Sequence, residues 1–322
     1  MINMRLSLVL LACILPVTVD GHAEMIFPAA RNLDNRVASG YCPHCGQGGG
    51  TALVAMRIAE TGGSFPAAYP DPTAEGTHGL CGDPFQTKAQ ADGYLAPISE
   101  QPFMTAGEVK ASWIEGDVVE LQIGISTNHK GFFEFRVCDE VLDVNTPDQV
   151  TGQACLDKHL LLRVDPDSRP ECLGANIGDM PDCQPLDTNY PSRWYLPPDA
   201  YAEAPDPNRP PNVPGDKFFR MQYKLPPGLT CQKCTMQWWW LTANSCHAEG
   251  EEEYYTSAKY LESPGAWTFG YNMQTCSLAA QTEQFWNCAD IRIEPFDGTF
   301  PPEPTPAPEL EEQEQEQEQE QE

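Results

Sequence analysis

The sequence predicts an all-β protein, namely an antiparallel β-sandwich of the immunoglobulin or fibronectin type with long loops pinned by disulfides. Three observations lead to this fold class. Short apolar segments separated by turn residues follow one another through the middle of the chain, as they do in a sandwich. The 31 prolines and 25 glycines among 322 residues disfavour long helices. The 13 cysteines are typical of an exported chain that is stabilised by disulfides.

The first segment of the chain has the composition of a secretory signal peptide. Arg5 supplies the positive charge, residues 6–17 supply the apolar stretch, and Gly21 is a small residue at the expected cut. We expect residues 1–21 to be removed, so that the mature chain begins with His22 and is secreted to the extracellular space. The apolar stretch is too short to span a bilayer, and no later run of 18 apolar residues follows, so we expect no membrane partner.

Residues 22–298 are expected to form one domain with strands in five short segments. These segments are 118–125, 132–138, 218–223, 236–242 and 289–293. The stretches 38–106 and 139–216 are rich in Gly, Pro, Asp and Cys, so we expect long loops there. Helix is expected only as a turn or two near residues 53–60.

The cysteines become twelve once Cys13 leaves with the leader, an even number that allows up to six disulfides. Spacing alone does not fix how they pair. Cys42 with Cys45, and Cys231 with Cys234, have a spacing that zinc sites also use. In an exported, cysteine-rich chain we interpret both pairs as disulfides.

The charge of the chain narrows the choice of partners. The formal net charge is −28, and the nine glutamates between residues 303 and 322 leave −19 for the rest. Such a chain repels nucleic acid and anionic membrane surfaces, so we expect neither as a partner. Residues 299–322, rich in Pro, Glu and Gln, are expected to form a disordered tail that solubilises the protein or attaches it to a wall or matrix.

A histidine at the mature amino terminus offers a metal ion two nitrogens, the α-amine and the imidazole Nδ1 of His22. His129 lies in an expected loop just before the strand segment 132–138, where a ring can point outward toward a ligand. Three nitrogens in a T-shaped arrangement suit a tetragonal Cu(II) ion better than zinc, calcium or magnesium. His22 and His129 are therefore candidate ligands of one copper ion.

Four stretches of the chain carry a more specific signal. They are residues 22–31, 128–135, 231–245 and 285–291. In content and order they resemble the copper-dependent lytic polysaccharide monooxygenases, most closely those of auxiliary-activity family fifteen. The resemblance implies that His22 and His129 bind one copper ion that cycles between Cu(II) and Cu(I). It also implies that Phe285 stands at the axial position of the metal, where the family often has tyrosine, and that Gln284 or Glu283 helps to position bound oxygen or peroxide.

The activity implied by this resemblance is oxidative cleavage of an insoluble polysaccharide by a secreted monooxygenase that takes electrons from an external donor. Chitin or cellulose is the substrate we expect, and we expect a monomer. Two other interpretations stay open at this point. One is a secreted copper-handling protein that uses the same histidines without turnover, and the other is a wall-binding module without a metal.

Aromatic and histidine residues outside this motif set have simpler interpretations. Alternation in a strand sends Trp238 and Trp240 to one face and Trp239 to the other, and core packing is the default for all three. A polysaccharide platform needs exposed rings beside the copper, for which Tyr41 and Tyr69 are candidates. The remaining histidines share no metal-ligand spacing: His44, His78, His159 and His247.

Overall fold

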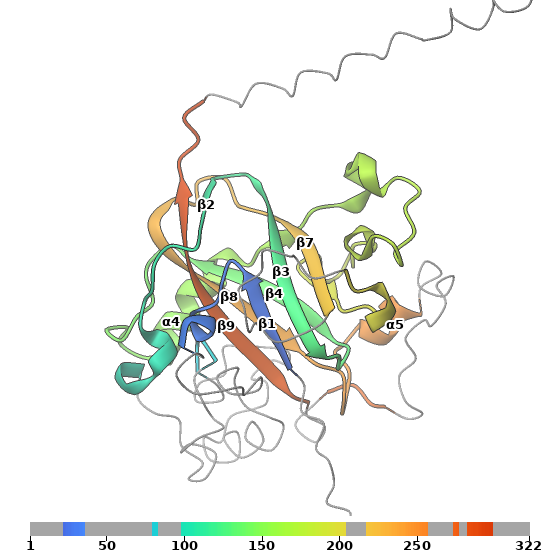
Figure 1. Ribbon diagram of the computed structural model, residues 1–322, viewed down its shortest axis with the longest axis horizontal. Helices are drawn as coiled ribbons and strands as arrows, with labels where there is room; N and C mark the ends of the chain where they lie inside the picture. The colour runs from blue at the N-terminus through green and yellow to red at the C-terminus, as the bar shows by residue number, and fades with distance from the viewer. Residues whose placement is uncertain are drawn as a thin grey trace, which may run out of the picture.

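The computed structural model describes residues 22–35, 79–82, 98–203, 217–256, 273–276 and 282–298, which form a two-layered β-sandwich (Figure 1). The strands are β1 (His22–Phe27), β2 (Ala111–Ile114), β3 (Val118–Thr127), β4 (Phe132–Cys138), β5 (Leu162–Arg163), β6 (Trp194–Tyr195), β7 (Lys217–Lys224), β8 (Cys231–Leu241) and β9 (Gln284–Glu294). The α-helices are α1 (Arg31–Asn35), α4 (Gln149–Leu156) and α5 (Glu251–Tyr255). Short 3-10 helices are η3 (Ile98–Glu100), η4 (Pro102–Met104), η5 (Asp157–His159), η6 (Pro166–Ser168), η7 (Pro170–Cys172), η8 (Pro181–Cys183) and η9 (Asp199–Tyr201).

The strands divide into a four-stranded sheet with the order β1-β3-β7-β5 and a five-stranded sheet with the order β2-β9-β8-β4-β6. This arrangement confirms the predicted β-sandwich, and each of the five predicted strand segments overlaps an observed strand. The prediction that all strands pair in antiparallel fashion is wrong for one pair of strands, because β2 and β9 run parallel. These two strands come from distant parts of the chain, so no hairpin forces them to run in opposite directions.

The main core lies between the two sheets and is built by alternate residues of each strand. Trp238 and Trp240 point into this core, and Phe285 on β9 joins them. Trp239 points to the other face of its sheet and packs with Trp286 and other aromatics. All three tryptophans of β8 are fully buried, so the predicted alternation and core packing are both confirmed.

The expectation that helix is confined to residues 53–60 is wrong, because α4 is a helix elsewhere in the chain. Residues 53–60 themselves lie outside the described residues. The helix begins at a cap, because the side chain of Asp148 accepts a hydrogen bond from the N–H of Thr151 at 2.7 Å. Its last turn is fastened to β4 by the disulfide between Cys155 and Cys138. Gly152 allows the helix to pack closely against Leu80, since a Cβ at this position would lie 2.4 Å from a methyl group of Leu80.

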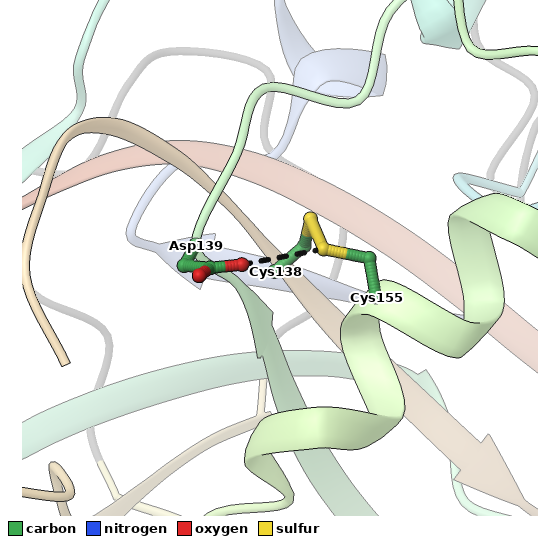
Figure 2. Close-up of side chains that lie close together, drawn as sticks. All are labelled: Cys138, Asp139 and Cys155. Carbon is green, nitrogen blue, oxygen red and sulfur yellow. Dashed lines mark hydrogen bonds between the residues drawn. A yellow bond between two sulfur atoms is a disulfide. The ribbon is translucent and has the colours of Figure 1, made fainter.

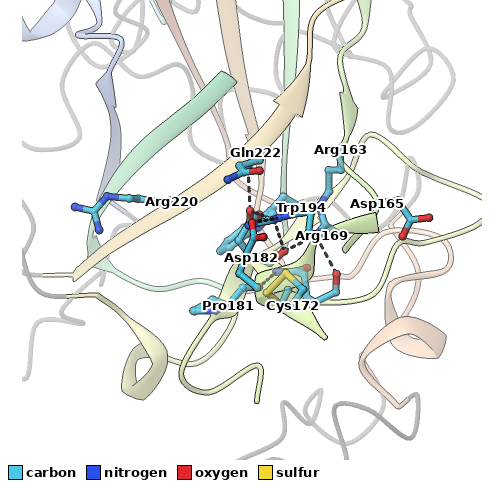
Figure 3. A network of polar contacts seen from close by, with 12 residues as sticks. Arg163, Asp165, Arg169, Cys172, Pro181, Asp182, Trp194, Arg220 and Gln222 are labelled. Carbon is cyan, nitrogen blue, oxygen red and sulfur yellow. Dashed lines mark hydrogen bonds and ion pairs between the residues drawn. A yellow bond between two sulfur atoms is a disulfide. The ribbon is translucent and has the colours of Figure 1, made fainter. Parts of the chain in front are cut away.

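Residues 157–203, which follow α4, consist mainly of loops, as expected, together with short 3-10 helices and the two-residue strands β5 and β6. Buried polar contacts and a disulfide fix this region (Figure 3). Cys172 and Cys183 are linked by a disulfide. Asp182 beside this bridge accepts hydrogen bonds from Arg169 at 2.5 Å, from the indole of Trp194 at 3.0 Å and from the backbone N–H of Gln222 at 3.1 Å. The carboxylate thereby joins the loop to β6 and β7. Burial raises the pKa of Asp182, and the neighbouring arginines oppose that rise.

Five disulfides join the described cysteines, and they confirm the expected disulfide framework. The pairs are Cys81–Cys288, Cys138–Cys155, Cys172–Cys183, Cys231–Cys234 and Cys246–Cys276. The interpretation of Cys231 and Cys234 as a disulfide is thus confirmed, whereas Cys42 and Cys45 lie outside the described residues. None of the described helices has the length and apolar character needed to cross a membrane.

Candidate metal centre

The two histidines expected to bind copper are brought to one end of the sandwich by adjacent strands. β1 pairs with β3, and the Cα of His22 lies opposite that of Thr127. His129 follows Thr127 by two residues, in the turn between β3 and β4. Figure 1 shows β1 beside β3 in the same layer. The side chain of His22 lies outside the described part of the structure, so this juxtaposition is one of backbones.

The turn that carries His129 is held on β8 through its carbonyl oxygens. The carbonyl of His129 accepts a hydrogen bond from the N–H of Ala243 at 2.8 Å. The carbonyl of Lys130 accepts one from the indole Nε1 of Trp240, also at 2.8 Å. Lys130 has a left-handed backbone with a φ of 58°, and its own N–H donates to the side chain of Asn128 at 2.8 Å. These contacts fix the backbone from which the His129 ring projects.

Gly131 closes the same turn in a position that requires glycine. Its φ is 81°, and a Cβ would lie 1.8 Å from the carbonyl oxygen of Leu241. Its carbonyl accepts hydrogen bonds from the N–H of Leu196 at 2.9 Å and from the hydroxyl of Tyr255 at 3.1 Å. Helix α5, which carries Tyr255, therefore fastens the turn as well.

Phe285 lies one ring away from His129. The imidazole of His129 stacks on Trp240 with 6.4 Å between ring centroids, and the centroids of Trp240 and Phe285 are 5.2 Å apart. Phe285 pairs with Trp240 across β8 and β9 and is only 2% exposed. A buried ring without a ligating atom provides an apolar wall that keeps water and additional ligands away from a metal.

A carboxylate faces the His129 ring from the residue before β9. Oε2 of Glu283 lies 3.7 Å from Nε2 of His129, and both side chains are only partly exposed. The side-chain amide of Asn244 donates to the same Oε2 at 2.6 Å. Thr282 donates to Oδ1 of Asn244 at 2.7 Å, and its hydroxyl lies 2.7 Å from that of Thr242. Glu283 is therefore held in place by a polar network at the end of β8 and β9.

Gln284 is not brought together with His129. Its side chain is 2% exposed, and its Oε1 accepts a hydrogen bond from the indole of Trp239 at 3.1 Å. Trp239 lies on the opposite face of its sheet from Trp240, so Gln284 lies on the face of β9 opposite Phe285. Of the two neighbouring candidates, Glu283 is the one beside the His129 ring.

The sequence alone does not predict a role for Asn244, Thr242 or Tyr255. Asn244 lies near the end of the motif stretch 231–245, and this is the feature of the sequence that could have indicated its importance. The sequence does not indicate which carboxylate or carbonyl these side chains meet, because their partners lie on strands and turns far away in the chain.

A second carboxyl, that of Glu251 at the start of α5, is buried below this turn. It is 0% exposed, and its Oε2 accepts a hydrogen bond from the N–H of Ala248 at 2.8 Å. Burial raises the pKa of Glu251 from 4.5 to about 7, although that hydrogen bond and the positive charges of Arg193 and Lys130 oppose the rise. Burial likewise lowers the pKa of Lys130, and the charge of Glu251 opposes that change.

Glu251 makes the stability of the fold depend on pH. Because the folded chain binds this proton more tightly than the unfolded chain, the stabilisation is fully present below pH 4.5 and is lost as the pH rises through about 7. We expect the free energy of unfolding to fall by about 1–3 kcal/mol over that window, and Glu251→Gln to flatten the fall. Urea denaturation at a series of pH values measures both slopes. Glu253→Gln, a change at an exposed position of the same helix, is the control, and equal slopes for wild type and Glu251→Gln would contradict the prediction.

Other metal-ligating side chains of the described residues do not form a site. The one group of three within reach of a common ion is Cys138, Asp139 and Cys155 (Figure 2). Its two sulfurs are joined to each other in a disulfide, so they are not available as thiolate ligands. His159 and His247 belong to no such group among the described residues. The other two histidines, His44 and His78, lie outside the described residues, as do the candidate platform residues Tyr41 and Tyr69.

The candidate ligands His22 and His129 are chemically suited to a copper ion. An imidazole suits copper, and the partly exposed ring of His129 stands at the end of the sandwich where the backbone of His22 also lies. The apolar ring of Phe285 lies one ring away from His129, and the carboxylate of Glu283 faces the His129 ring directly. Calcium and magnesium prefer sets of oxygen ligands, whereas the described residues place the carboxylate of Glu283 beside an imidazole, a nitrogen ligand.

Comparison with known proteins adds a family assignment. The sequence matches the family described as lytic polysaccharide mono-oxygenase, cellulose-degrading, over residues 22–291. No curated protein matches the sequence.

Several solved structures are similar to the chain. A lytic polysaccharide monooxygenase of type AA15 from Thermobia domestica, in the Cu(I) state, has 20% identity and a TM-score of 0.44, covering 85% of this chain and 99% of its own. A cellulose-active lytic polysaccharide monooxygenase in complex with copper has 12% identity and a TM-score of 0.33, covering 84% and 98%. A chitin-binding domain from Burkholderia pseudomallei has 10% identity and a TM-score of 0.29, covering 85% and 100%.

Proposed function

The chain belongs to the lytic polysaccharide mono-oxygenase family, and from this premise we propose that it is a secreted, copper-dependent enzyme that cleaves the glycosidic bonds of a polysaccharide by oxidation. Chitin or cellulose is the proposed substrate. The observation that carries the proposal is the family match itself, which begins at His22, the residue whose backbone pairs beside the turn of His129.

The proposed copper ligands are the α-amine and imidazole of His22 and the imidazole of His129. Such an ion supplies the one-electron redox chemistry that oxidation of a sugar C–H bond requires. Phe285 excludes water from the core side of the site. The carboxylate of Glu283, fixed by Asn244, orients small molecules beside Nε2 of His129 and holds or releases a proton at Oε2. Gln284 supports the strand from behind through its hydrogen bond with Trp239.

The proposed amine ligand exists only after the leader is removed. We propose that residues 1–21 are cleaved during export and that residues 22–298 form the catalytic domain, followed by the tail 299–322. The disulfides of the described chain support an oxidising, extracellular destination. An external donor then supplies electrons to the monomeric enzyme.

The test uses protein secreted by a eukaryotic host that removes the leader. Mass spectrometry of its amino terminus is expected to find His22, and calorimetry is expected to find one copper ion per chain. The copper-loaded protein is then incubated with a reductant, peroxide and a panel of chitin, cellulose and other wall glycans, and the released sugars are analysed for oxidised ends. Oxidised oligosaccharides support the proposal.

Two other outcomes lead to different conclusions. Stoichiometric copper without oxidised sugars on any glycan indicates the copper-handling alternative. Another amino terminus, or a protein that binds glycan but no copper, overturns the copper site itself.

A further inference from the structure

The strand that carries His22 is only weakly aligned by its pairing with β3. Its register shifts between His22 and Ala23 and again between Met25 and Phe27, so regular pairing covers only three residues. Among the described strands β1 is also an edge strand, bonded to a single neighbour within its sheet. Register shifts of this kind locally disrupt the ladder and redirect the side chains beyond them. A further contact is needed to determine where the amino-terminal residue lies.

Asn287 on β9 provides that contact from the other sheet. Its Oδ1 accepts a hydrogen bond from the backbone N–H of Met25 at 3.0 Å, and its Nδ2 donates to the carbonyl of Trp286 at 2.6 Å. The side chain is 0% exposed. A buried amide is costly unless it is hydrogen-bonded. The hydrogen bond with Met25 therefore favours this one alignment of β1 over others in which the amide of Asn287 would lack that partner.

The position of Asn287 links the two parts of the proposed copper site. Asn287 is two residues from Phe285 on the same strand, and side chains at that spacing share one face of the sheet. Met25 is three residues from His22, a distance of about 10 Å along an extended strand. The hydrogen bond therefore joins the strand of the axial ring to the strand of the amino-terminal ligand. The carbonyl of Met25 is held as well, by the N–H of Ala30 at 3.2 Å.

We propose that Asn287 is a positioning residue, whose hydrogen bond to the N–H of Met25 fixes β1 against β9 and so sets where the amine of His22 lies relative to Phe285. This inference rests on the proposed copper site. It requires a hydrogen-bond acceptor at position 287. A side chain that only filled space in the core would need the right shape but no acceptor.

The test compares Asn287→Leu with Asn287→Asp in the mature protein, with copper alone as the probe. Leucine has the same branched arrangement of side-chain heavy atoms but accepts no hydrogen bond, and its variant is expected to have a copper dissociation constant at least about tenfold higher, with a changed Cu(II) electron paramagnetic resonance spectrum. Aspartate keeps the acceptor for the N–H of Met25, so its variant is expected to keep the wild-type spectrum, although its buried charge and the lost donor to the carbonyl of Trp286 lower the melting temperature. An unchanged spectrum and affinity in Asn287→Leu, or equal losses in both variants, would overturn the inference.

A matched control and a second measurement complete the test. Gln237→Leu removes an equally buried amide from the neighbouring strand, whose bonds go to Leu80 and Gln153 and not to β1. It is expected to lower stability without changing the copper spectrum. Hydrogen exchange of the wild-type chain is expected to show a protected Met25 amide, and rapid exchange there would also overturn the inference. A wild-type protein that binds no copper would instead refute the proposed function, and this inference with it.

Discussion

The variant His129→Ala is expected to lose copper affinity by more than about a hundredfold and to release no oxidised oligosaccharides. Loss of groups that only support a ligand costs about 10–100-fold in metal affinity, and His129 is proposed to supply one of three ligand nitrogens directly. The fold is expected to survive, because the turn is held by backbone contacts of Lys130 and Gly131 that do not involve the imidazole. Calorimetry with copper and mass spectrometry of the released sugars measure the two losses.

His159→Ala is the matched control for this change. His159 is also a partly exposed histidine, lies in η5, and belongs to no candidate site. Its removal is expected to leave copper binding and product release unchanged. If His129→Ala still bound one copper ion with wild-type affinity, His129 would not be a ligand and the proposed site would be wrong.

The second large effect is expected at a buried ion pair that joins α1 to β9. Asp290 accepts hydrogen bonds from Arg31 at 2.6 and 3.0 Å and from the N–H of Gly107 at 2.7 Å. The two charged side chains are 4% and 1% exposed. Asp290→Ala leaves the guanidinium charge buried without its partner, so we expect the free energy of unfolding to fall by about 3–5 kcal/mol. Urea denaturation followed by fluorescence measures the loss.

Two further variants show whether the uncompensated charge is the cause. The double variant Arg31→Met with Asp290→Leu removes both charges and is expected to recover much of the loss. Lys158→Ala breaks an exposed ion pair with Asp139, 3.8 Å apart, and is expected to cost less than about 1 kcal/mol. A fall of less than that amount in Asp290→Ala would contradict the prediction.

The strands that were predicted from sequence are those whose alternation is long and uninterrupted. β4 and β8 carry aromatic and aliphatic residues at every second position, and both faces of their sheet are covered, so their apolar signal is strong. β2 was missed because it has four residues, none of them fully buried, and pairs with a strand from the other end of the chain. α4 was missed because it is short and Gly152 interrupts its helical pattern.

The site was predictable only in part, for a similar reason. Three local features are contained in the sequence: the position of His22 after the expected leader, the loop position of His129 and the motif around Phe285. The contacts of Glu283 with Asn244, and of Asn287 with Met25, join residues that are far apart in the chain. Alternation along β9 also separates Gln284 from Phe285, but the observed start of that strand was needed to establish which face each residue occupies.

The disulfide between Cys81 and Cys288 spans a separation of 207 residues and closes most of the segment 22–298 into one covalent ring. A protease that cuts any single peptide bond inside this ring leaves the two fragments attached to each other. Such nicked molecules would migrate as intact protein in electrophoresis until a thiol is added. A single cut between Cys81 and Cys288 would therefore leave His22 and His129 in one covalently linked molecule.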